Sequence, residues 1–379
     1  MKIGILTLPL HTNYGGILQA YALQTTLERL GHEVYVITLN YSAQTFPLHK
    51  VCYIFTRRVI GSVIRRRRYA YYNINKESKY YSEIYEAKAS LINRFICRYI
   101  HRHLYRVLSK DVHQSDFNGY VVGSDQIWRL RYIQGCFNTY DAFLDFAKNW
   151  NVRRIAYAAS FGIDKWEFDE ESTDRIQSLL RLFAAISVRE KSGVELCNQY
   201  LDINAKHVLD PTLLLEKEQY EYIIQQSDIP IPKQSNILTH YVLDQNEDLT
   251  LLIKKVAVEK RLTPFSLDLC NSSSKQSTPL PSIEQWLAAF RDASFVITDS
   301  FHACVFSIIF RKPFIVIGNK SRGYSRFISL LQTFGLEGNL ITSVDDYNPT
   351  KSYEVSDTVY DKLFELKKDS IQFLKTHLS

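Results

Sequence analysis

The chain has 379 residues, of which 46 % are hydrophobic and 23 % are charged. This length exceeds what one hydrophobic core usually holds and predicts two domains, and the composition is ordinary for a soluble globular protein. No stretch approaches the roughly 20 apolar residues of a membrane span, and the first apolar run lacks a small-residue cleavage site, so we expect a cytoplasmic protein.

The first elements form a βαβ unit with glycines at its first turn. Lys2 to Leu8 is a compact apolar strand, Gly15 and Gly16 open a helical pattern, and Val34 to Leu39 is a second strand. The full GxGxxG fingerprint is absent, and Asn40 follows the second strand where an acidic ribose ligand is expected. NAD is therefore not an expected cofactor.

The segment from about residue 48 to residue 112 carries the positive charge of the chain. The net charge is +6, but between Lys50 and Lys110 there are 15 Lys and Arg against 3 Asp and Glu, a balance of +12 that leaves −6 elsewhere. We interpret the segment as a basic insert of helices with long polar faces. No nucleic-acid-binding module is recognisable, so nucleic acid is not an expected partner.

Part of this insert, Val51 to Arg68, mixes apolar and cationic residues. Such a mixture favours peripheral contact with an anionic membrane surface, here on the inner face of the cell membrane. A solvated helical face is the simpler explanation for any single one of these arginines.

Short apolar strands return after the insert at regular intervals, with helical patterns between them. They span Tyr120 to Asp125, Arg154 to Gly162, Ala184 to Glu190 and Lys206 to Pro211. This alternation predicts a mostly parallel sheet with helices on its faces. We assign residues 1–228 to a first α/β domain.

A second α/β series follows the linker-like stretch "IPIPKQS" at 229–235. Its predicted strands are Ile237 to Val242, Pro264 to Leu269, Phe295 to Thr298 and Pro313 to Ile317. Ser282 and Gln285 form a plausible capping box for a helix between the second and third of these strands. An amphipathic helix from about Thr358 to Leu378 ends the chain, and we assign residues 229–379 to a second domain.

Polar and ionisable residues recur where the predicted strands end. Ligands of parallel α/β sheets bind at the carboxyl ends of the strands, so this recurrence in both halves predicts a site in a cleft between two domains. The six cysteines are scattered singly, which indicates neither a metal site nor a disulfide framework. The strand-end residues are Asn13, Gly15, Gly16, Ser124, Asp125, Ser160, Arg189, Ser300 and His302.

Several of these residues have a structural explanation that the sequence leaves open. Gly15 and Gly16 either allow close helix packing or let an anion approach a helix N-terminus. Asp125 is alternatively a helix N-cap, and Arg189 a structural partner of a buried aspartate. A lone histidine is most often a hydrogen-bonded core residue, but the strand-to-helix position of His302 favours a function.

The stretch "NKSRGYSRF" at 319–327 places Lys320, Arg322 and Arg326 on a loop that leads into a helix. Such a cluster suits a phosphate or a carboxylate, because helix N–H groups and guanidinium groups converge there. The alternative is a solvated loop.

Six stretches, in order, resemble the polysaccharide pyruvyl transferase family and together span roughly Ile3 to Phe334. They are "GILTLPLHTNYGGILQAYALQ", "VVGSDQIW", "AYAASFG", "SVRE", "VLDPTLLL" and "ITDSFHACVFSIIFRKPFIVI". The resemblance implies a GT-B-like α/β fold, with two Rossmann-like domains whose parallel sheets face an interdomain cleft, and no obligatory metal. It also implies transfer of the enolpyruvyl group of phosphoenolpyruvate, as co-substrate, to a sugar of a cell-surface polysaccharide, exopolysaccharide or capsule, or of its lipid-linked precursor, forming a pyruvate ketal.

The family's histidine-bearing turn matches Ser300 and His302, its arginine after the "SV" strand matches Arg189, and its Gly-Ser-Asp turn matches Asp125. Ala303 departs from the glycine that many relatives carry. We expect His302 and Asp125 to be catalytic. The expected contacts with phosphoenolpyruvate are Arg189, Arg322, Arg326, Ser300, Gly15 and Gly16, and those with the acceptor sugar are Asn13, Ser124 and Ser160.

Two other functions fit the same residues. One is a nucleotide-sugar glycosyltransferase of the GT-B type. The other is a non-catalytic glycan-binding protein of capsule assembly, although loss of Asp125, Arg189 or His302 would then be expected and all three are present.

Overall fold

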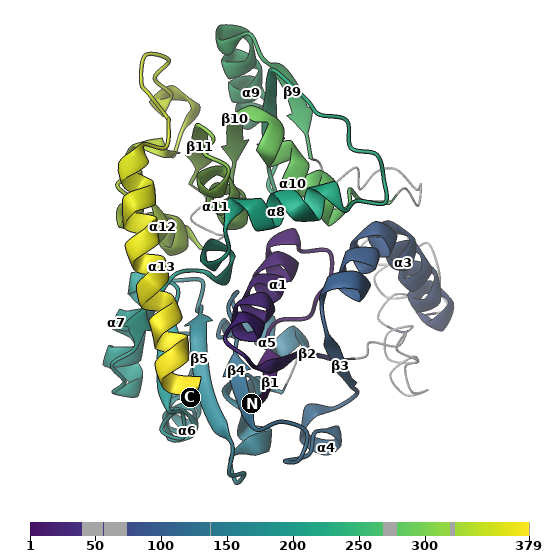
Figure 1. Cartoon of the computed structure of the whole chain (residues 1–379), viewed down its shortest axis with the longest axis vertical. Helices are drawn as coiled ribbons and strands as arrows, with labels where there is room; N and C mark the ends of the chain where they lie inside the picture. Colours follow the sequence, from purple (N-terminus) through teal and green to yellow (C-terminus); the bar gives the residue numbers. More distant parts are fainter. Residues whose placement is uncertain (40–55, 57–73, 137, 268–278, 319–322, 379) are drawn as a thin grey trace.

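The structure is a computed structural model of the chain that describes residues 1–39, 56, 74–136, 138–267, 279–318 and 323–378. Its elements form two parallel sheets with helices on their faces (Figure 1). The predicted fold class is confirmed: the chain is an α/β protein with a GT-B-like arrangement of two Rossmann-like units.

The N-terminal sheet has seven strands in the order β3-β2-β1-β4-β5-β6-β7, and every pair is parallel. The strands are β1 (Lys2–Leu6), β2 (Glu33–Leu39), β3 (Arg102–Tyr105), β4 (Gly119–Val122), β5 (Arg153–Ala159), β6 (Ala185–Val188) and β7 (Lys206–His207). The helices of this half are α1 (Tyr14–Arg29), α3 (Ile74–Tyr99), α4 (Leu108–Asp111), α5 (Leu130–Cys136), α6 (Glu170–Leu180) and α7 (Lys191–Leu201).

The C-terminal sheet has five parallel strands in the order β12-β11-β10-β8-β9. The strands are β8 (Ile237–Tyr241), β9 (Thr263–Ser266), β10 (Ala293–Thr298), β11 (Phe314–Ile317) and β12 (Leu340–Ile341). The helices are α8 (Lys217–Gln225), α9 (Glu247–Lys260), α10 (Ile283–Asp292), α11 (Phe301–Ile309), α12 (Tyr324–Phe334) and α13 (Asp357–Leu378).

Local sequence explains where two key helices begin. Asn13 caps α1, because its side-chain oxygen accepts a hydrogen bond from the backbone N–H of Gly16 at 3.2 Å. Ser282 and Gln285 form the predicted capping box at the start of α10. Both caps fix the first turn of a helix that packs between the two sheets.

The insert at 48–112 differs from the prediction of helices throughout. Its described part contains α3 and α4, but Arg102–Tyr105 forms β3, which pairs with β2 at the edge of the N-terminal sheet. An edge strand has one neighbour and tolerates polar residues on its free side, which explains why the sequence "RHLY" was not recognised as a strand. The stretch Val51 to Arg68 lies outside the described residues, apart from Thr56, and its membrane role stays a prediction.

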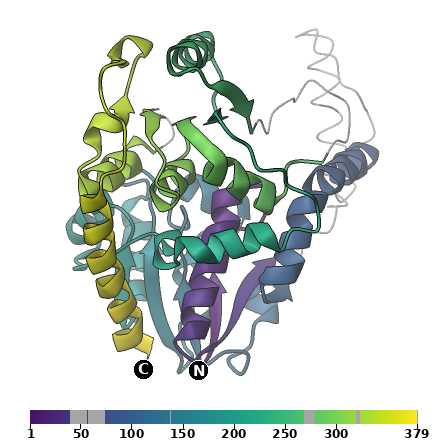
Figure 2. The same ribbon diagram turned by 45° about the horizontal axis from the view of Figure 1, so that its top comes forward.

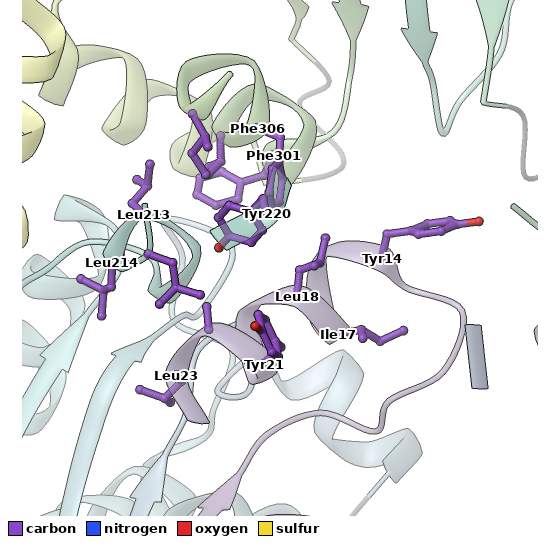
Figure 3. Close-up of a cluster of buried hydrophobic side chains, with 14 of the residues drawn as sticks. Tyr14, Ile17, Leu18, Tyr21, Leu23, Leu213, Leu214, Tyr220, Phe301 and Phe306 are labelled. Carbon is purple, nitrogen blue, oxygen red and sulfur yellow. The ribbon is translucent and has the colours of Figure 1, made fainter. Parts of the chain in front are cut away.

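A continuous apolar core joins the two halves of the chain. Figure 3 shows aromatic and aliphatic side chains of α1, α8, α11 and the 3-10 helix at Pro211–Leu214 pointing toward one another. Tyr220 packs edge-on against Phe306 with ring centroids 4.9 Å apart, and Tyr14 stacks on Trp286 at 5.5 Å. Burying each such ring contributes about 1.5–3 kcal/mol, so the two sheets are held in one orientation by packing.

Helix α13 leaves the C-terminal sheet and runs along the N-terminal one, so that the two chain ends lie close together (Figure 2). Ser370 accepts a hydrogen bond from the backbone N–H of Leu209 at 3.1 Å, and Arg153 donates one to the carbonyl of His377 at 2.7 Å. We assigned this terminal helix to the second domain from the sequence. In the structure it packs along the first domain and is hydrogen-bonded to it. None of the described helices is long and apolar enough to cross a membrane.

Candidate functional site

A cavity of about 280 Å³ lies between the two sheets. It is lined by residues that follow β1, β4, β8 and β10, together with residues of α5 and α12. The carboxyl ends of strands from both sheets therefore meet at one site, as the sequence predicted. The lining residues used below are Asn13, Gly15, Asp125, Tyr132, Tyr241, Ser300, His302 and Arg326.

His302 stands in the first turn of α11 and lines the cavity, although its side chain is only 7 % exposed. The imidazole ring lies directly over Gly15 at the start of α1, where a Cβ atom would come within 2.0 Å of Nδ1. Only glycine leaves room for this contact. Close packing, one of the two explanations left open for Gly15, is therefore present, and the group packed against it is His302; an anion contact at this helix N-terminus stays a prediction.

Asp125 occupies a left-handed backbone conformation, with φ 62°, just after β4. Aspartate tolerates this region better than most residues, and such conformations cluster at functional sites. Its carboxylate accepts a hydrogen bond from the side-chain N–H of Asn13 at 3.2 Å and lines the cavity. Because the next helix begins at Leu130, Asp125 is not a helix N-cap.

Arg189 lies beneath the cavity rather than on its surface, and its side chain is 2 % exposed. It donates a hydrogen bond to Asp210 at 2.8 Å, and its other nitrogens lie 3.8 Å from Asp125 and 3.9 Å from Glu190. Burial alone lowers the pKa of Arg189, but the three carboxylates outweigh burial and raise it. Within the described residues, no group of His, Cys, Asp or Glu side chains is arranged to hold a metal ion.

Asp210 is the residue of this site that the sequence did not single out. One carboxylate oxygen accepts hydrogen bonds from the backbone and hydroxyl of Thr212, and the other accepts from Arg189 and from the hydroxyl of Ser124. That second oxygen also lies 3.6 Å from Nε2 of His302. Burial favours the protonated acid, but His302, Arg189 and Thr212 together hold the pKa of Asp210 well below its usual value.

The contact between Asp210 and His302 crosses from one sheet to the other. Asp210 follows β7 of the N-terminal sheet, whereas His302 follows β10 of the C-terminal sheet. The signal for Asp210 was present in the stretch "VLDPTLLL", where an aspartate ends an apolar strand. It was overlooked because such an aspartate ordinarily caps the turn that follows, which Asp210 also does through Thr212.

Ser124 and Ser160, the predicted acceptor contacts, are fully buried below the cavity. The Ser124 hydroxyl donates to Asp210, and the Ser160 hydroxyl donates to Glu190 at 2.8 Å. Neither side chain lines the cavity. The structure places both in the layer that holds the buried carboxylates. Asn13, the third predicted acceptor contact, does line the cavity.

Arg326 and Ser300, two of the predicted donor contacts, line the cavity, whereas Gly16 lies next to it beside Asp125. The guanidinium of Arg326 lies 5.6 Å from the ring centroid of Phe301, and that of Arg189 lies 4.5 Å from the same centroid. Burial, followed by the nearby charge of Arg189, lowers the pKa of Arg326 to about 10. Lys320 and Arg322 lie outside the described residues.

Three helices present their first turns to the cavity. Gly15 belongs to the first turn of α1, His302 to that of α11 and Arg326 to that of α12. Neither α11 nor α12 has a side-chain cap at its N-terminus. Helix N-termini carry partial positive charge and unsatisfied N–H donors, so this convergence makes the cavity suited to an anion.

The fold and the site together define a two-unit α/β protein with a polar cavity between its sheets that suits an anion. The family model described as polysaccharide pyruvyl transferase matches residues 13–321. The chain therefore belongs to the polysaccharide pyruvyl transferase family and is a transferase. A search of the curated proteins finds no match.

Several solved structures are similar to this chain at low sequence identity. The UDP-GlcNAc 2-epimerase from Methanocaldococcus jannaschii is 12 % identical, with 97 % of this chain and 92 % of that chain covered and a TM-score of 0.45. The UDP-GlcNAc 2-epimerase from Neisseria meningitidis, bound to UDP-GlcNAc, is 11 % identical, with 98 % and 93 % covered and a TM-score of 0.46. Spinosyn forosaminyltransferase is 10 % identical, with 99 % and 94 % covered and a TM-score of 0.43.

Replacing Asp210 with asparagine tests the buried network. We expect the free energy of unfolding at pH 7 to fall by about 3–5 kcal/mol, because breaking a buried ion pair leaves Arg189 undercompensated. The folded-state pKa of Asp210 lies below its unfolded value of about 3.9, so its contribution is full above that pH and is lost as the pH falls through the folded-state value. Denaturant unfolding at a series of pH values measures both effects.

The exposed Asp164 gives the matched control, since Asp164→Asn removes a carboxylate at the surface. Wild-type stability of Asp210→Asn at pH 7 would contradict the buried network. So would a stability difference that stays constant from neutral pH into the acid range.

Proposed function

We propose that the protein transfers the enolpyruvyl carbon skeleton of phosphoenolpyruvate to a sugar of a cell-surface polysaccharide or of its lipid-linked precursor, and closes a pyruvate ketal. The observation that carries this proposal is the cavity in which His302 and Arg326 meet the first turns of three helices. This arrangement offers donors for two anionic groups beside a group that moves protons, in a chain of the pyruvyl transferase family.

Phosphoenolpyruvate, the pyruvyl donor, is held by positively charged side chains and by helix N-termini. Phosphoenolpyruvate carries a phosphate and a carboxylate, and both accept hydrogen bonds from backbone N–H groups and from guanidinium groups. Arg326 is the described arginine that lines the cavity. Its pKa is lowered first by burial and then by Arg189, so an anion bound beside it relieves an unfavourable environment. Arg189 acts indirectly, by holding the carboxylates of Asp210 and Asp125.

The first chemical step protonates the methylene carbon of phosphoenolpyruvate. His302 supplies this proton, and the carbon that bears the phosphate becomes a cationic centre. The Asp210 carboxylate, 3.6 Å from Nε2, stabilises the protonated ring before transfer and fixes its orientation. Gly15 allows the ring to stand at the start of α1, close to the donor.

A sugar hydroxyl then attacks the cationic carbon and loses its proton. The Asp125 carboxylate, oriented by Asn13, accepts that proton. Phosphate leaves, and a second hydroxyl of the sugar attacks the same carbon to close the ketal. Asp125 passes its proton to the leaving phosphate, and the proton of the second hydroxyl returns to His302 in place of the one given to the new methyl group, so the reaction balances and both side chains are restored. Tyr132 and Tyr241 form the aromatic part of the wall against which the acceptor sugar lies.

We place this reaction in the cytoplasm, at the inner face of the cell membrane. The basic stretch Val51 to Arg68 supports this placement, since anionic lipid attracts clustered Lys and Arg. A lipid-linked acceptor would then be within reach.

The direct test is incubation of the protein with isotope-labelled phosphoenolpyruvate and a panel of lipid-linked or aryl glycosides. We expect one glycoside to gain the mass of a labelled pyruvate ketal with release of phosphate. Sugar transfer from a nucleotide sugar, without reaction of phosphoenolpyruvate, would instead establish a glycosyltransferase. Glycan binding without any transfer would establish a non-catalytic role.

Replacing His302 with asparagine should remove turnover and spare the fold. We expect pyruvyl transfer to fall by at least about 10², as is typical for loss of a positioned general acid. Phosphoenolpyruvate affinity should stay within a few-fold, and the melting temperature should be nearly unchanged. The exposed His113→Asn is the matched control. Early unfolding, or turnover at the wild-type rate, would make His302 a structural residue.

Replacing Arg326 with glutamine should weaken donor binding more than acceptor binding. The loss of a charge-assisted hydrogen bond costs about 1.5–3 kcal/mol, which corresponds to roughly 10-fold to 100-fold in affinity. Calorimetric titration with phosphoenolpyruvate measures it, with Arg311→Gln as control because Arg311 pairs with Asp357 at the surface. An unchanged affinity would remove Arg326 from the donor site.

A further inference from the structure

A second polar pocket, of about 730 Å³, lies at the opposite end of the C-terminal sheet, beside the amino ends of β8, β10 and β11. It is bounded by α8, by the segment that precedes β8, by the end of α10 with the start of β10, and by the chain after α11. Its volume falls within the range of small-molecule sites. No step of the proposed reaction uses it.

Four cations and two carboxylates line this pocket. Both oxygens of Asp292 accept hydrogen bonds from Arg291, at 2.7 and 2.9 Å, so these two charges cancel. Lys217 pairs with Glu221 at 3.2 Å. Lys233 and Lys312 have no such partner among the carboxylates of the described residues, and they leave the pocket with a surplus of two positive charges.

The cations of the pocket lie close enough to influence one another. Lys312 is about half-buried, and its pKa is lowered first by this burial and then by Lys217, Arg291 and Lys233. Asp292 offsets only part of the repulsion, because its charge is shared with Arg291. An anion bound among these lysines would stabilise all of them at once.

The uncharged side chains that line the pocket are of the kinds that bind a sugar. Amide and hydroxyl side chains stand around the cations, namely Gln225, Gln234, Ser235, Asn236 and Ser294. Ile231 gives a small hydrophobic surface, whereas Phe310 and Ala293 border the pocket but are almost fully buried. Short polar side chains of this kind pair with hydroxyl groups, and an apolar patch packs against a sugar face.

The pocket is separate from the catalytic cavity, but β10 and α11 each extend from one to the other. Ala293, at the start of β10, lines the pocket, and Ser300, just after the end of β10, lines the cavity. A six-residue strand spans roughly 20 Å. Helix α11 likewise runs from His302 at the cavity to Phe310 at the pocket.

We propose that this pocket is a second, non-catalytic site for a saccharide that carries a phosphate or a carboxylate. The saccharide part rests on the proposed function, in which a glycan is the substrate, whereas the anion part rests on the pocket itself. A chain that modifies polysaccharides would use such a site to hold a charged part of the polymer while another part reacts.

The test is calorimetric titration of the full chain with four probes. Glucose 6-phosphate and tri-galacturonic acid represent the two anionic sources, maltotriose is the neutral saccharide, and inorganic phosphate is the anion without a sugar. We expect both anionic saccharides to bind more tightly than maltotriose and phosphate. The double substitution Lys233→Gln with Lys312→Gln should weaken them by about 10-fold or more, whereas Lys362→Gln on α13 and Arg326→Gln should not.

Three outcomes would overturn the proposal: equal binding of inorganic phosphate, equal binding of maltotriose, or anionic binding that survives the lysine double substitution. Binding lost in Arg326→Gln instead would place the ligand in the catalytic cavity. Pyruvyl transfer to a small neutral glycoside should be unaffected by the lysine double substitution. An absence of transfer in the wild type would therefore refute the proposed function without deciding whether this pocket binds its ligand.

Discussion

The ion pair between Arg189 and Asp210 is the interaction on which the site depends. Both side chains are buried, and a buried charge is tolerated only when it is paired and hydrogen-bonded. Asp210 meets this condition through contacts on both of its oxygens, and it then presents its remaining face to His302 across the boundary between the sheets. The orientation of His302 is thereby tied to the orientation of the two halves of the chain.

The surrounding structure follows from this constraint. The two sheets must approach closely enough for His302 to reach Asp210, and Gly15 is the residue whose missing side chain allows that approach. The aromatic core around Tyr220 and Phe306 and the strap formed by α13 hold the sheets at this distance. Once they are so placed, the first turns of α1, α11 and α12 necessarily face the same cavity, and their partial charges make it suited to an anion.

Much of this arrangement was predictable from the sequence. Alternating strands and helices indicated two parallel sheets, and polar residues at strand ends indicated where their ligand site lies. Hydrophobic periodicity, however, does not show whether a side chain at the end of a strand lines the cavity or is buried beneath it. Ser124, Ser160 and Arg189 were therefore expected in contact with substrate, and the structure places them one layer below the cavity. Asp210 was overlooked because its pairing across the sheets is a tertiary contact with no local signature. The edge strand β3 was missed because its residues are polar.

A crystal structure of the protein with bound phosphoenolpyruvate tests the central claim most directly, namely that the cavity beneath His302 is the donor site. We predict phosphate and carboxylate groups hydrogen-bonded to the first turns of the converging helices and to Arg326, with the methylene carbon beside the His302 ring. Phosphoenolpyruvate bound outside this cavity, or bound within it with its methylene carbon turned away from His302, would contradict the account.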